Sequence, residues 1–443
     1  LQLREVSDAI YGTIPLYYPL NLIIDTSEFQ RLRRLKQTGV LAFVFPGAEH
    51  SRFTHCLGVY HLASTFVKSL ADRLNLNISS RDQLCVAIAG LCHDIGSWFL
   101  YFPVLYHEEA TVQLFRRICS NSKLKKELDD FLEPEDYIFI EELISPPKKK
   151  FNENGHWICK GRPAEKSYLY DIICNNNDSF DVDKYDYILR DATFTGMGLA
   201  MNLNTVRRII NGAMPLEAAD KFGNKCLRLC YAYKVFNELQ SVAESRYHLH
   251  SSVYNQKAVC ACEYLTVQAF KAAARFIKFI GDDGKEYDLG HVTENLGAFL
   301  QCDDGVFDEI LRSRSEELRV ARNYVDCLIH RRLPKYVAAV EIRDGEIAEK
   351  WTDESRWLHC GMGISKSPLS EVYMYDQKSF VPKPYRARDQ WLKDNPRYLA
   401  GNFTVTAFVS FEAYENQREI IEAVYKAFSS VFGNGDYIAP VMH

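Results

Sequence analysis

Two histidines and two aspartates are the residues of this 443-residue chain whose types and spacing suit a metal ion. They are His55, the adjacent pair His93-Asp94, and Asp183. Imidazole nitrogens combined with carboxylate oxygens suit Fe, Zn, Mn or Mg, and such a set leaves coordination positions open for water and a phosphoryl oxygen. Together the four residues predict an open divalent-metal site for hydrolysis. Taken alone, the His93-Asp94 doublet is also typical of a structural salt bridge or a helix cap.

Helices must bring these four residues together. Adjacent side chains on a helix point about 100° apart, so a His-Asp doublet can converge on one ion only at a helix end. Gly96 provides such an end directly after the doublet. Apolar residues at three- and four-residue steps predict amphipathic helices after His55 and before His93. These repeats are Val59, Leu62, Phe66, Leu70 and Leu74, and then Leu84, Ile88, Leu91 and Ile95.

Signals for β-strands are concentrated late in the sequence. Residues 337–342 precede Asp344-Gly345, which predicts a hairpin, and residues 403–411 alternate between apolar and polar side chains. Apolar residues over 420–431 predict a helix after them. The pattern predicts a mainly α protein, with a large helical domain over residues 1–313 and a smaller α+β region over residues 314–443.

Composition restricts the class of protein and its partners. With 47% hydrophobic and 25% charged residues the chain is typical of a globular protein, and no run of about 18 apolar residues predicts a membrane span. The net charge of −5 gives no general reason to bind nucleic acid or an anionic membrane, so an anionic ligand needs a local group of basic residues. The 13 cysteines are scattered, which favours reduced thiols and a nuclear or cytoplasmic protein. Because the sequence starts at Leu1 and not at Met, we expect it to be part of a longer chain.

Several segments, in the same order, resemble the HD-domain phosphohydrolases and, within them, the SAM-and-HD-domain dNTP triphosphohydrolases. These segments are residues 24–33, 45–48, 89–94, 160–163, 181–184, 332–337 and 437–440. The resemblance spans nearly the whole chain, although no SAM module is visible in it. It implies a helical HD-domain core and hydrolysis of a deoxynucleoside triphosphate to the deoxynucleoside and triphosphate, by attack of water on the α-phosphorus.

The resemblance also implies which residues act on the substrate. His93, Asp94, Arg52 and His107 fall on catalytic positions. The residues on substrate-binding positions are Lys184, Tyr187, Asp191, Arg246, His250, Tyr254 and Gln37. Basic groups would hold the triphosphate, and an aromatic ring near C2′ would exclude a ribose hydroxyl by its bulk. Read singly, the tyrosines are also compatible with a half-buried core, Arg246 with a surface cation, and His250 with a bond to a carbonyl group.

A second set of residues matches the family's regulatory nucleotide site, which forms where subunits meet. The matching residues are, for guanine, Asp25, Gln30 and Arg33; from the C-terminal region, Arg331 and Lys335; and for a neighbouring activator pocket, Arg207 and Lys234. A carboxylate accepts hydrogen bonds from guanine N1–H and N2–H, which favours GTP over ATP. The resemblance therefore implies GTP or dNTP activators and a homodimer or homotetramer. Without any ligand, Asp25 is also compatible with a helix N-cap.

The resemblance is weakest directly after the His-Asp doublet. The family carries two further histidines there, one of them the proton donor to the leaving group. In this chain Gly96 is followed by Ser97-Trp98, and the next histidine is His107. Either a loop segment is missing from the sequence, which we expect, or the general acid has been lost. Loss would favour a catalytically silent relative that binds nucleotides or nucleic acid, and hydrolysis of another phosphoester is the remaining alternative.

Overall fold

The computed structural model describes residues 3–98 and 107–342, with the shorter stretches 356–358, 372–377, 379–384, 402–409, 422–423, 426 and 437–438. Helices predominate among these residues, which confirms the mainly α class, and none of the described helices is long and apolar enough to cross a membrane. The helices not introduced below are α1 (Leu20–Ile24), α2 (Ser27–Gln30), η1 (Arg31–Arg34), η2 (Gly39–Phe43), α6 (Ser122–Asp129), η3 (Ala164–Asp171), α9 (Leu203–Gly212), η4 (Tyr233–Val235), α10 (Phe236–Leu249), η5 (His250–Tyr254), η6 (Val292–Glu294), α12 (Leu296–Phe299) and α13 (Val306–Arg312).

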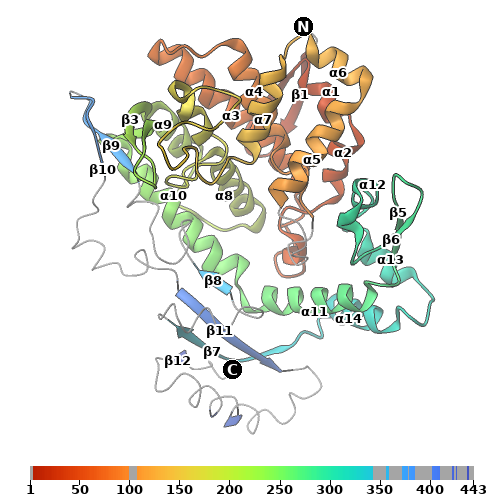
Figure 1. The fold of residues 1–443 in the computed structure, drawn as a ribbon. Helices are drawn as coiled ribbons and strands as arrows, with labels where there is room; N and C mark the ends of the chain where they lie inside the picture. Colours follow the sequence, from red (N-terminus) through yellow and green to blue (C-terminus); the bar gives the residue numbers. More distant parts are fainter. Residues whose placement is uncertain are drawn as a thin grey trace.

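Three helices form the centre of the helical body (Figure 1). Helix α3 (Arg52–Leu74) packs against α4 (Ser80–Cys92) and α8 (Val182–Thr195) around one hydrophobic core. The predicted apolar repeats provide the buried faces of α3 and α4, so both helices are confirmed. Gly90 lets the two helices approach closely, because a Cβ at this position would lie 2.9 Å from the Cβ of Ala63.

The turn after α4 is closed tightly against the next helix. The backbone N–H of Ser97 donates to the carbonyl of Asp94 at 3.0 Å, and the N–H of Gly96 donates to Thr111 Oγ1 at 3.0 Å. Thr111 belongs to α5 (His107–Ser120), and a Cβ at Gly96 would lie 2.2 Å from its backbone nitrogen. Only glycine therefore fits at position 96 in this arrangement.

Short antiparallel sheets accompany the helices, and the sequence analysis did not predict those in the first part of the chain. Strands β1 (Leu3–Asp8) and β2 (Gly12–Tyr17) form an N-terminal hairpin, and β5 (Lys278–Ile280) pairs with β6 (Glu286–Asp288). Strand β3 (Ala213–Ala219) pairs with β4 (Lys225–Ala232). This sheet is extended by β9 (Tyr373–Tyr375), which runs parallel to β4, and then by β10 (Pro382–Pro384).

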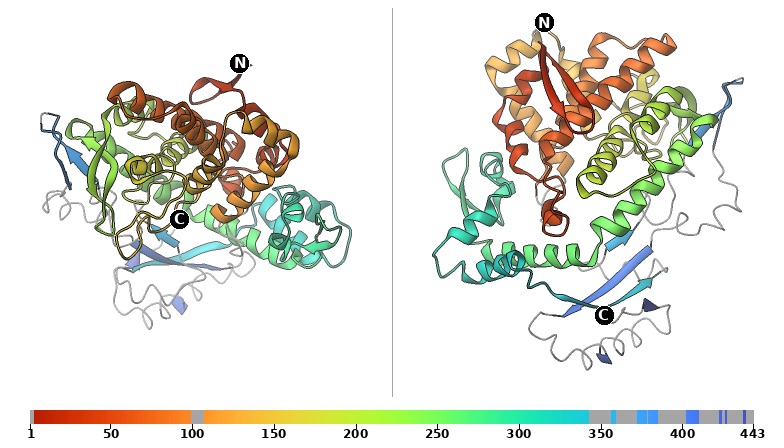
Figure 2. Two further views of the ribbon diagram at one scale, coloured as in Figure 1. Left: turned by 45° about the horizontal axis from the view of Figure 1, so that its top comes forward. Right: turned by 180° about the vertical axis from the view of Figure 1, so that it is seen from behind.

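The C-terminal part of the chain forms a second four-stranded sheet, visible below the helical body in Figures 1 and 2. Its strand order is β12 (Tyr437–Ile438), β7 (Lys335–Ile342), β11 (Asn402–Val409) and β8 (Arg356–Leu358), all antiparallel. The predicted strands at 337–342 and 403–409 are thus confirmed, but β7 pairs with β11 and β12, and the predicted turn at Asp344-Gly345 lies outside the described residues. Most of the helix predicted over 420–431 also lies outside them.

Within the described residues, the helical body and the C-terminal region are in contact at several places. Helix α14 (Arg319–Ile329) packs along α11 (Lys257–Ala273), and β9 extends the β3–β4 sheet (Figure 2). The chain therefore returns to the helical body after residue 314. The division into domains 1–313 and 314–443 stays a prediction.

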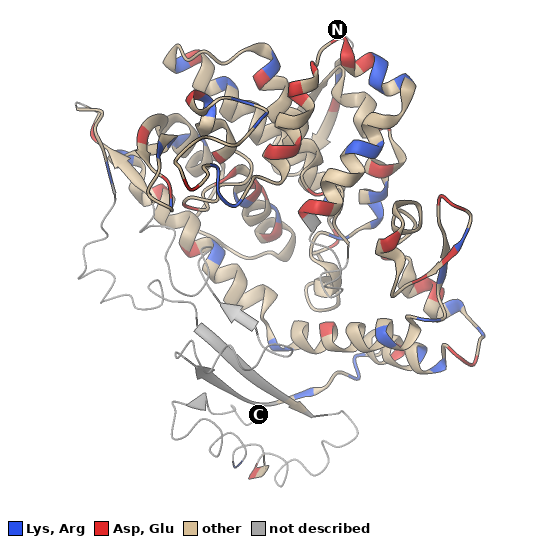
Figure 3. Ribbon diagram, viewed as in Figure 1, with Lys and Arg blue, Asp and Glu red and all other residues tan. Residues whose placement is uncertain are grey.

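Acidic and basic residues are interspersed along the described helices (Figure 3), and some of the acidic residues are buried. Asp82 and Asp136 each close a reciprocal hydrogen-bonded cap, at α4 and at α7 (Pro134–Ile144) respectively. Arg162 donates to Asp82 Oδ1 at 2.6 Å and also pairs with Asp136. Because both carboxylates are shielded from water, Arg162 supplies charge neutralisation that the solvent cannot.

We expect Arg162→Gln to lower the free energy of unfolding by about 3 kcal/mol or more, since it removes the cation shared by two buried carboxylates. Arg116→Gln is the matched control, because Arg116 is 64% exposed and pairs with Glu141 at the surface. That change should cost less than about 1 kcal/mol. Urea unfolding of both variants measures the difference, and equal losses would contradict the role assigned to Arg162.

Candidate metal centre

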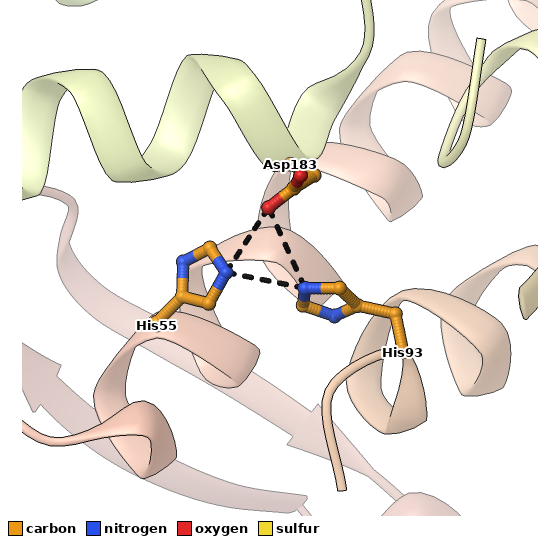
Figure 4. A group of neighbouring side chains, drawn as sticks. All are labelled: His55, His93 and Asp183. Carbon is orange, nitrogen blue, oxygen red and sulfur yellow. Dashed lines mark hydrogen bonds and ion pairs between the residues drawn. The ribbon is translucent and has the colours of Figure 1, made fainter. Parts of the chain in front are cut away.

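Three of the four predicted metal ligands converge in the structure (Figure 4). Asp183 Oδ1 lies 3.1 Å from His55 Nε2 and 3.6 Å from His93 Nε2, and the two imidazole nitrogens are 3.1 Å apart. All three ligand atoms lie within 4.8 Å of one another. A single cation could therefore contact two nitrogens and one oxygen at once.

Each of the three side chains projects from a helix end. His55 lies in the first turn of α3, His93 caps the C-terminal end of α4, and Asp183 lies in the first turn of α8. The helices pack side by side, so their ends meet at one point. The side chain of His55 is 1% exposed whereas that of Asp183 is 33% exposed, so the group opens on the Asp183 side.

Both histidines are oriented by a hydrogen bond from the other ring nitrogen. His55 Nδ1 donates to Asp186 Oδ2 at 2.7 Å, and His93 Nδ1 donates to the carbonyl of Gly90 at 2.9 Å. Such bonds fix the tautomer and turn the Nε2 lone pair toward the ion in known metal sites. The arrangement therefore has the form of a ligand set with its supporting partners in place.

The electrostatic field at this group favours positive charge. Burial lowers the pKa of His55, but its bonds with Asp183 and Asp186 outweigh burial and raise that pKa to about 9. Burial likewise opposes ionisation of Asp183, but the two histidines hold the pKa of its carboxyl well below the usual range. A site that stabilises protons in this way also attracts a divalent cation, which would compete with them. The donor set therefore fits a resident Fe, Zn, Mn or Mg ion.

Asp94, the fourth predicted ligand, lies outside the three-residue group. Its carboxylate pairs with Arg52 and accepts a hydrogen bond from Ser97 Oγ at 2.9 Å. Burial opposes its ionisation, but the charges of Arg52 and His93 outweigh burial and lower the pKa of Asp94 below its usual range. Arg52, predicted to contact phosphate, is thus adjacent to the centre, and the metal-ligand role of Asp94 stays a prediction.

Six of the residues predicted to bind substrate form two groups of contacts, Arg246 with Tyr187 and a network of four around Asp191. Arg246 Nε donates to the hydroxyl of Tyr187 at 2.8 Å, and Tyr254 donates to Asp191 Oδ2 at 2.5 Å. The rings of His250 and Tyr254 are 4.9 Å apart within η5, a single π-helical turn, and such turns are frequent at functional sites. Gln37 joins this network through the backbone of His50. The seventh residue, Lys184, donates to Asp181 Oδ2 at 3.0 Å.

His50 connects Gln37 to Asp191 in this network, and the sequence analysis missed it. Its Nε2 lies 2.7 Å from Asp191 Oδ1, its ring stacks on Phe194, and its carbonyl accepts from the backbone N–H of Gln37 at 2.9 Å. Among the described residues, His50 Nδ1 and Gln37 Oε1 are buried atoms without a hydrogen-bond partner. Buried polar atoms normally have a partner, so both are available to a polar ligand.

A cavity of about 240 Å³ lies beside the N-terminal hairpin. Three predicted guanine-reading residues, Asp25, Gln30 and Arg33, line it together with Arg4. Arg4 donates two hydrogen bonds to the carboxylate of Asp25, at 2.8 and 2.7 Å. Thr26, not Asp25, caps α2, which overturns the reading of Asp25 as a helix N-cap.

The other predicted regulatory residues do not line this cavity within the described part of the chain. Arg331 donates to the carbonyl of Phe43 at 2.8 Å, and Lys335 begins β7. Arg207 and Lys234 are exposed on α9 and η4. The side chain of His107 lies outside the described residues, as do residues 99–106, so the expectation of a missing loop segment stays a prediction.

Asp186 and Arg190 are further residues that the sequence analysis missed. They follow Asp183 on the same helix at steps of three and four residues, and this spacing was a readable signal that they share its face. Asp186 supports His55, and Arg190 supports Asp186. His50, by contrast, has no spacing pattern that separates it from an ordinary loop histidine.

Comparisons with known proteins agree with this geometry. The HD-domain family model matches residues 52–183, which include all three converging ligands. The chain is 34% identical over 355 residues to deoxynucleoside triphosphate triphosphohydrolase SAMHD1 of Homo sapiens, covering 76% of this chain and 55% of that protein. It is 30% identical to a SAMHD1 homolog of Dictyostelium discoideum, over 80% of this chain and 63% of that protein. A putative HD domain-containing protein of Acanthamoeba polyphaga mimivirus is 26% identical over 83% of this chain and 84% of its own length. The chain spans a little over half the length of the vertebrate relatives that it matches.

We expect His93→Ala and Asp183→Ala each to remove most of the bound metal, because each deletes one of three converging ligand atoms. His291→Ala is the matched control, since His291 is exposed, lies outside the ligand group and pairs with the nearby Asp288. Metal content of the purified proteins, measured by elemental analysis, checks the prediction. Unchanged metal content in both ligand variants would contradict the assignment of His93 and Asp183 as metal ligands.

Proposed function

Because the chain is an HD-domain protein related to the SAMHD1 group, we propose that it hydrolyses deoxynucleoside triphosphates to the deoxynucleoside and triphosphate. The observation that carries the proposal is the group of His55, His93 and Asp183 inside the region that matches the HD domain. The relatives' name states this reaction for those proteins. The three residues, with Asp94 as a further ligand, are proposed to hold a divalent metal, which would supply Lewis-acid activation of the α-phosphate and of water.

The residues of the chain itself are proposed to bind and orient the substrate. Arg52 lies beside Asp94 at the edge of the metal centre, and Lys184 directly follows Asp183, so both can neutralise phosphate charge near the ligand group. Arg246, held by Tyr187, would contact the outer phosphates. The arginine fork suits this role because it presents several donors to phosphate oxygens.

The sugar is proposed to bind at the network around Asp191. Asp191 and Tyr254 would meet the 3′ side of the deoxyribose, while His250 and Tyr187 pack beside the ring. The buried atoms His50 Nδ1 and Gln37 Oε1 support this placement, since a sugar hydroxyl would supply the partner that each of them needs. An enclosing wall of aromatic rings would exclude a 2′-hydroxyl by its bulk.

Regulation is proposed to occur at the hairpin cavity. Asp25, Gln30 and Arg33 gather there, and Asp25 would read guanine, with Arg4 released from the ion pair to meet the activator's phosphates. Arg331 and Lys335 would be contributed by another subunit, and Arg207 and Lys234 would serve a neighbouring dNTP. The active form is therefore proposed to be a dimer or tetramer of a nuclear or cytoplasmic protein.

The activity itself is tested by incubating the protein with dGTP, GTP and Mn²⁺ and separating the products. We expect deoxyguanosine and triphosphate in equal amounts, with His93→Ala reducing the rate by at least about 100-fold because a metal ligand is lost. Release of orthophosphate or of a monophosphate would instead indicate hydrolysis of another phosphoester. Nucleotide binding without turnover would indicate the catalytically silent alternative.

The regulatory site is tested separately by Asp25→Ala. We expect this variant to lose GTP-driven assembly, because the guanine-reading carboxylate is removed while the metal ligands stay. Glu5→Gln is the control, since Glu5 is an exposed acid on the N-terminal hairpin next to the cavity and is not among the residues that line it. Sedimentation velocity with and without GTP measures assembly. Identical sedimentation of wild type and Asp25→Ala under both conditions would exclude this role for Asp25.

A further inference from the structure

A chain of buried polar groups runs from the N-terminal hairpin to the metal centre. Arg190 is fully buried, and its Nε and NH2 donate to the two oxygens of Asp186 at 2.9 and 3.0 Å. Its NH1 donates to Asp8 Oδ2 at 2.9 Å. Asp8 is the last residue of β1, whereas Asp186 and Arg190 lie on α8. One guanidinium therefore joins two elements that are far apart in the sequence.

Asp186 is held from every side. Its Oδ2 accepts from His55 Nδ1 and Arg190 Nε, and its Oδ1 accepts from Arg190 NH2 and from the hydroxyl of Tyr11 at 2.8 Å. Gly58 on α3 makes room for this carboxylate, because a Cβ there would lie 1.8 Å from Asp186 Oδ1. With each oxygen bonded twice, the orientation of Asp186, and with it that of the His55 ring, is set by these partners.

The hairpin supplies two of the partners through one turn. Asp8 Oδ1 accepts from the backbone N–H groups of Ile10 and Tyr11, at 2.8 and 3.1 Å, while its Oδ2 accepts from Arg190. The same aspartate thus shapes the turn that places Tyr11 and balances the charge of Arg190. Without the Asp8 carboxylate, Arg190 would lose one of its two carboxylate partners, and the turn that places Tyr11 would lose two hydrogen bonds.

Asp8 also belongs to the wall of the hairpin cavity, as do Arg4 and Ser7 from the same strand. The opposite wall is formed by Asp25, Gln30 and Phe53. A ligand in this cavity would touch both walls and so fix the hairpin against the helical body. Because one oxygen of Asp8 is already bonded to Arg190, fixing the hairpin also fixes the support of His55.

We propose that Asp8 and Tyr11 are positioning residues of the metal centre, which act on His55 through Asp186 and Arg190, and that nucleotide in the hairpin cavity thereby raises the metal affinity of the centre. The inference rests on the proposed metal centre and on the proposed nucleotide site. It assigns to the hairpin a role that neither of those proposals requires.

The first test measures Mn²⁺ affinity of the whole chain by calorimetry, without nucleotide. Changes to residues that support a metal ligand typically weaken binding by about 10–100-fold, and we expect about 3–10-fold for Asp8→Asn and Tyr11→Phe, which act one step further away. Glu5→Gln removes the same charge from the same strand and should leave the affinity unchanged. The unfolding midpoint is measured in parallel. A lower midpoint with unchanged Mn²⁺ affinity in both variants would show a merely structural role and overturn the proposal.

Tyr11→Phe keeps the test decisive if Asp8→Asn fails to fold, because it deletes only one hydroxyl. Absence of Mn²⁺ binding in the wild type would overturn the proposed metal centre and this inference together. Wild-type binding with unchanged variants would overturn the inference alone.

The second test compares Mn²⁺ affinity in GTP and in the same concentration of ATP, which chelates Mn²⁺ to the same degree. We expect at least a 3-fold higher affinity in GTP for the wild type and for Glu5→Gln, and no difference for Asp8→Asn. If Asp8→Asn kept the higher Mn²⁺ affinity in GTP, the proposed coupling between the hairpin cavity and the metal centre would be wrong. The same would follow if the wild type bound GTP but showed no higher Mn²⁺ affinity. Either result would leave the proposed nucleotide site intact. Failure of the wild type to bind GTP would overturn both the proposed nucleotide site and its coupling to the metal centre.

Discussion

The hydrogen bond between His55 and Asp186 is the interaction on which the rest of the site depends. A metal-binding imidazole must present one nitrogen to the ion and keep the other occupied, and Asp186 does this from inside the core, where water cannot substitute. Asp186 can be ionised there because Arg190 and His55 outweigh burial and hold the pKa of its carboxyl at about 2. Three features of the fold place this one carboxylate. They are the packing of α3 on α8, the glycine at position 58 and the N-terminal hairpin.

At two places an arginine that is largely shielded from solvent connects two elements. Arg162 joins the N-terminal ends of α4 and α7, and Arg190 joins the hairpin to α8. A guanidinium has five donors in a fixed plane, so one side chain can satisfy two carboxylates in defined directions, which a lysine cannot. The cost of burying these charges is offset only when every partner is present, so each cluster specifies its own geometry.

The sequence was sufficient to predict helices α3 and α4 and the three residues that converge at the ligand group, for physical reasons. The apolar repeats of α3 and α4 are long and regular, and the His93-Asp94 doublet lies at the helix end that Gly96 marks. It was not sufficient where contacts between residues distant in the sequence determine the structure. Asp94 pairs with Arg52, Asp8 reaches Arg190 across 182 residues, and β9 joins a sheet built from the much earlier strands β3 and β4. The hairpin strand β1 escaped prediction because most of its side chains are exposed and give no alternating pattern.

One short segment connects the lining of the hairpin cavity to the turn that follows Asp94. Gln30 and Arg33 line the cavity, and between them Arg31 turns into the core. Its Nε donates to the carbonyl of Cys302 at 2.8 Å and its NH1 to that of Ser97 at 2.9 Å, while its plane lies over the ring of Phe299. Burial lowers the pKa of Arg31 to about 10, which leaves it charged at neutral pH and able to hold the turn after Asp94. Arg31 is adjacent in sequence to Gln30 and begins the 3₁₀ turn that contains Arg33, so the wall of the cavity and the support of the turn after Asp94 are parts of one continuous segment.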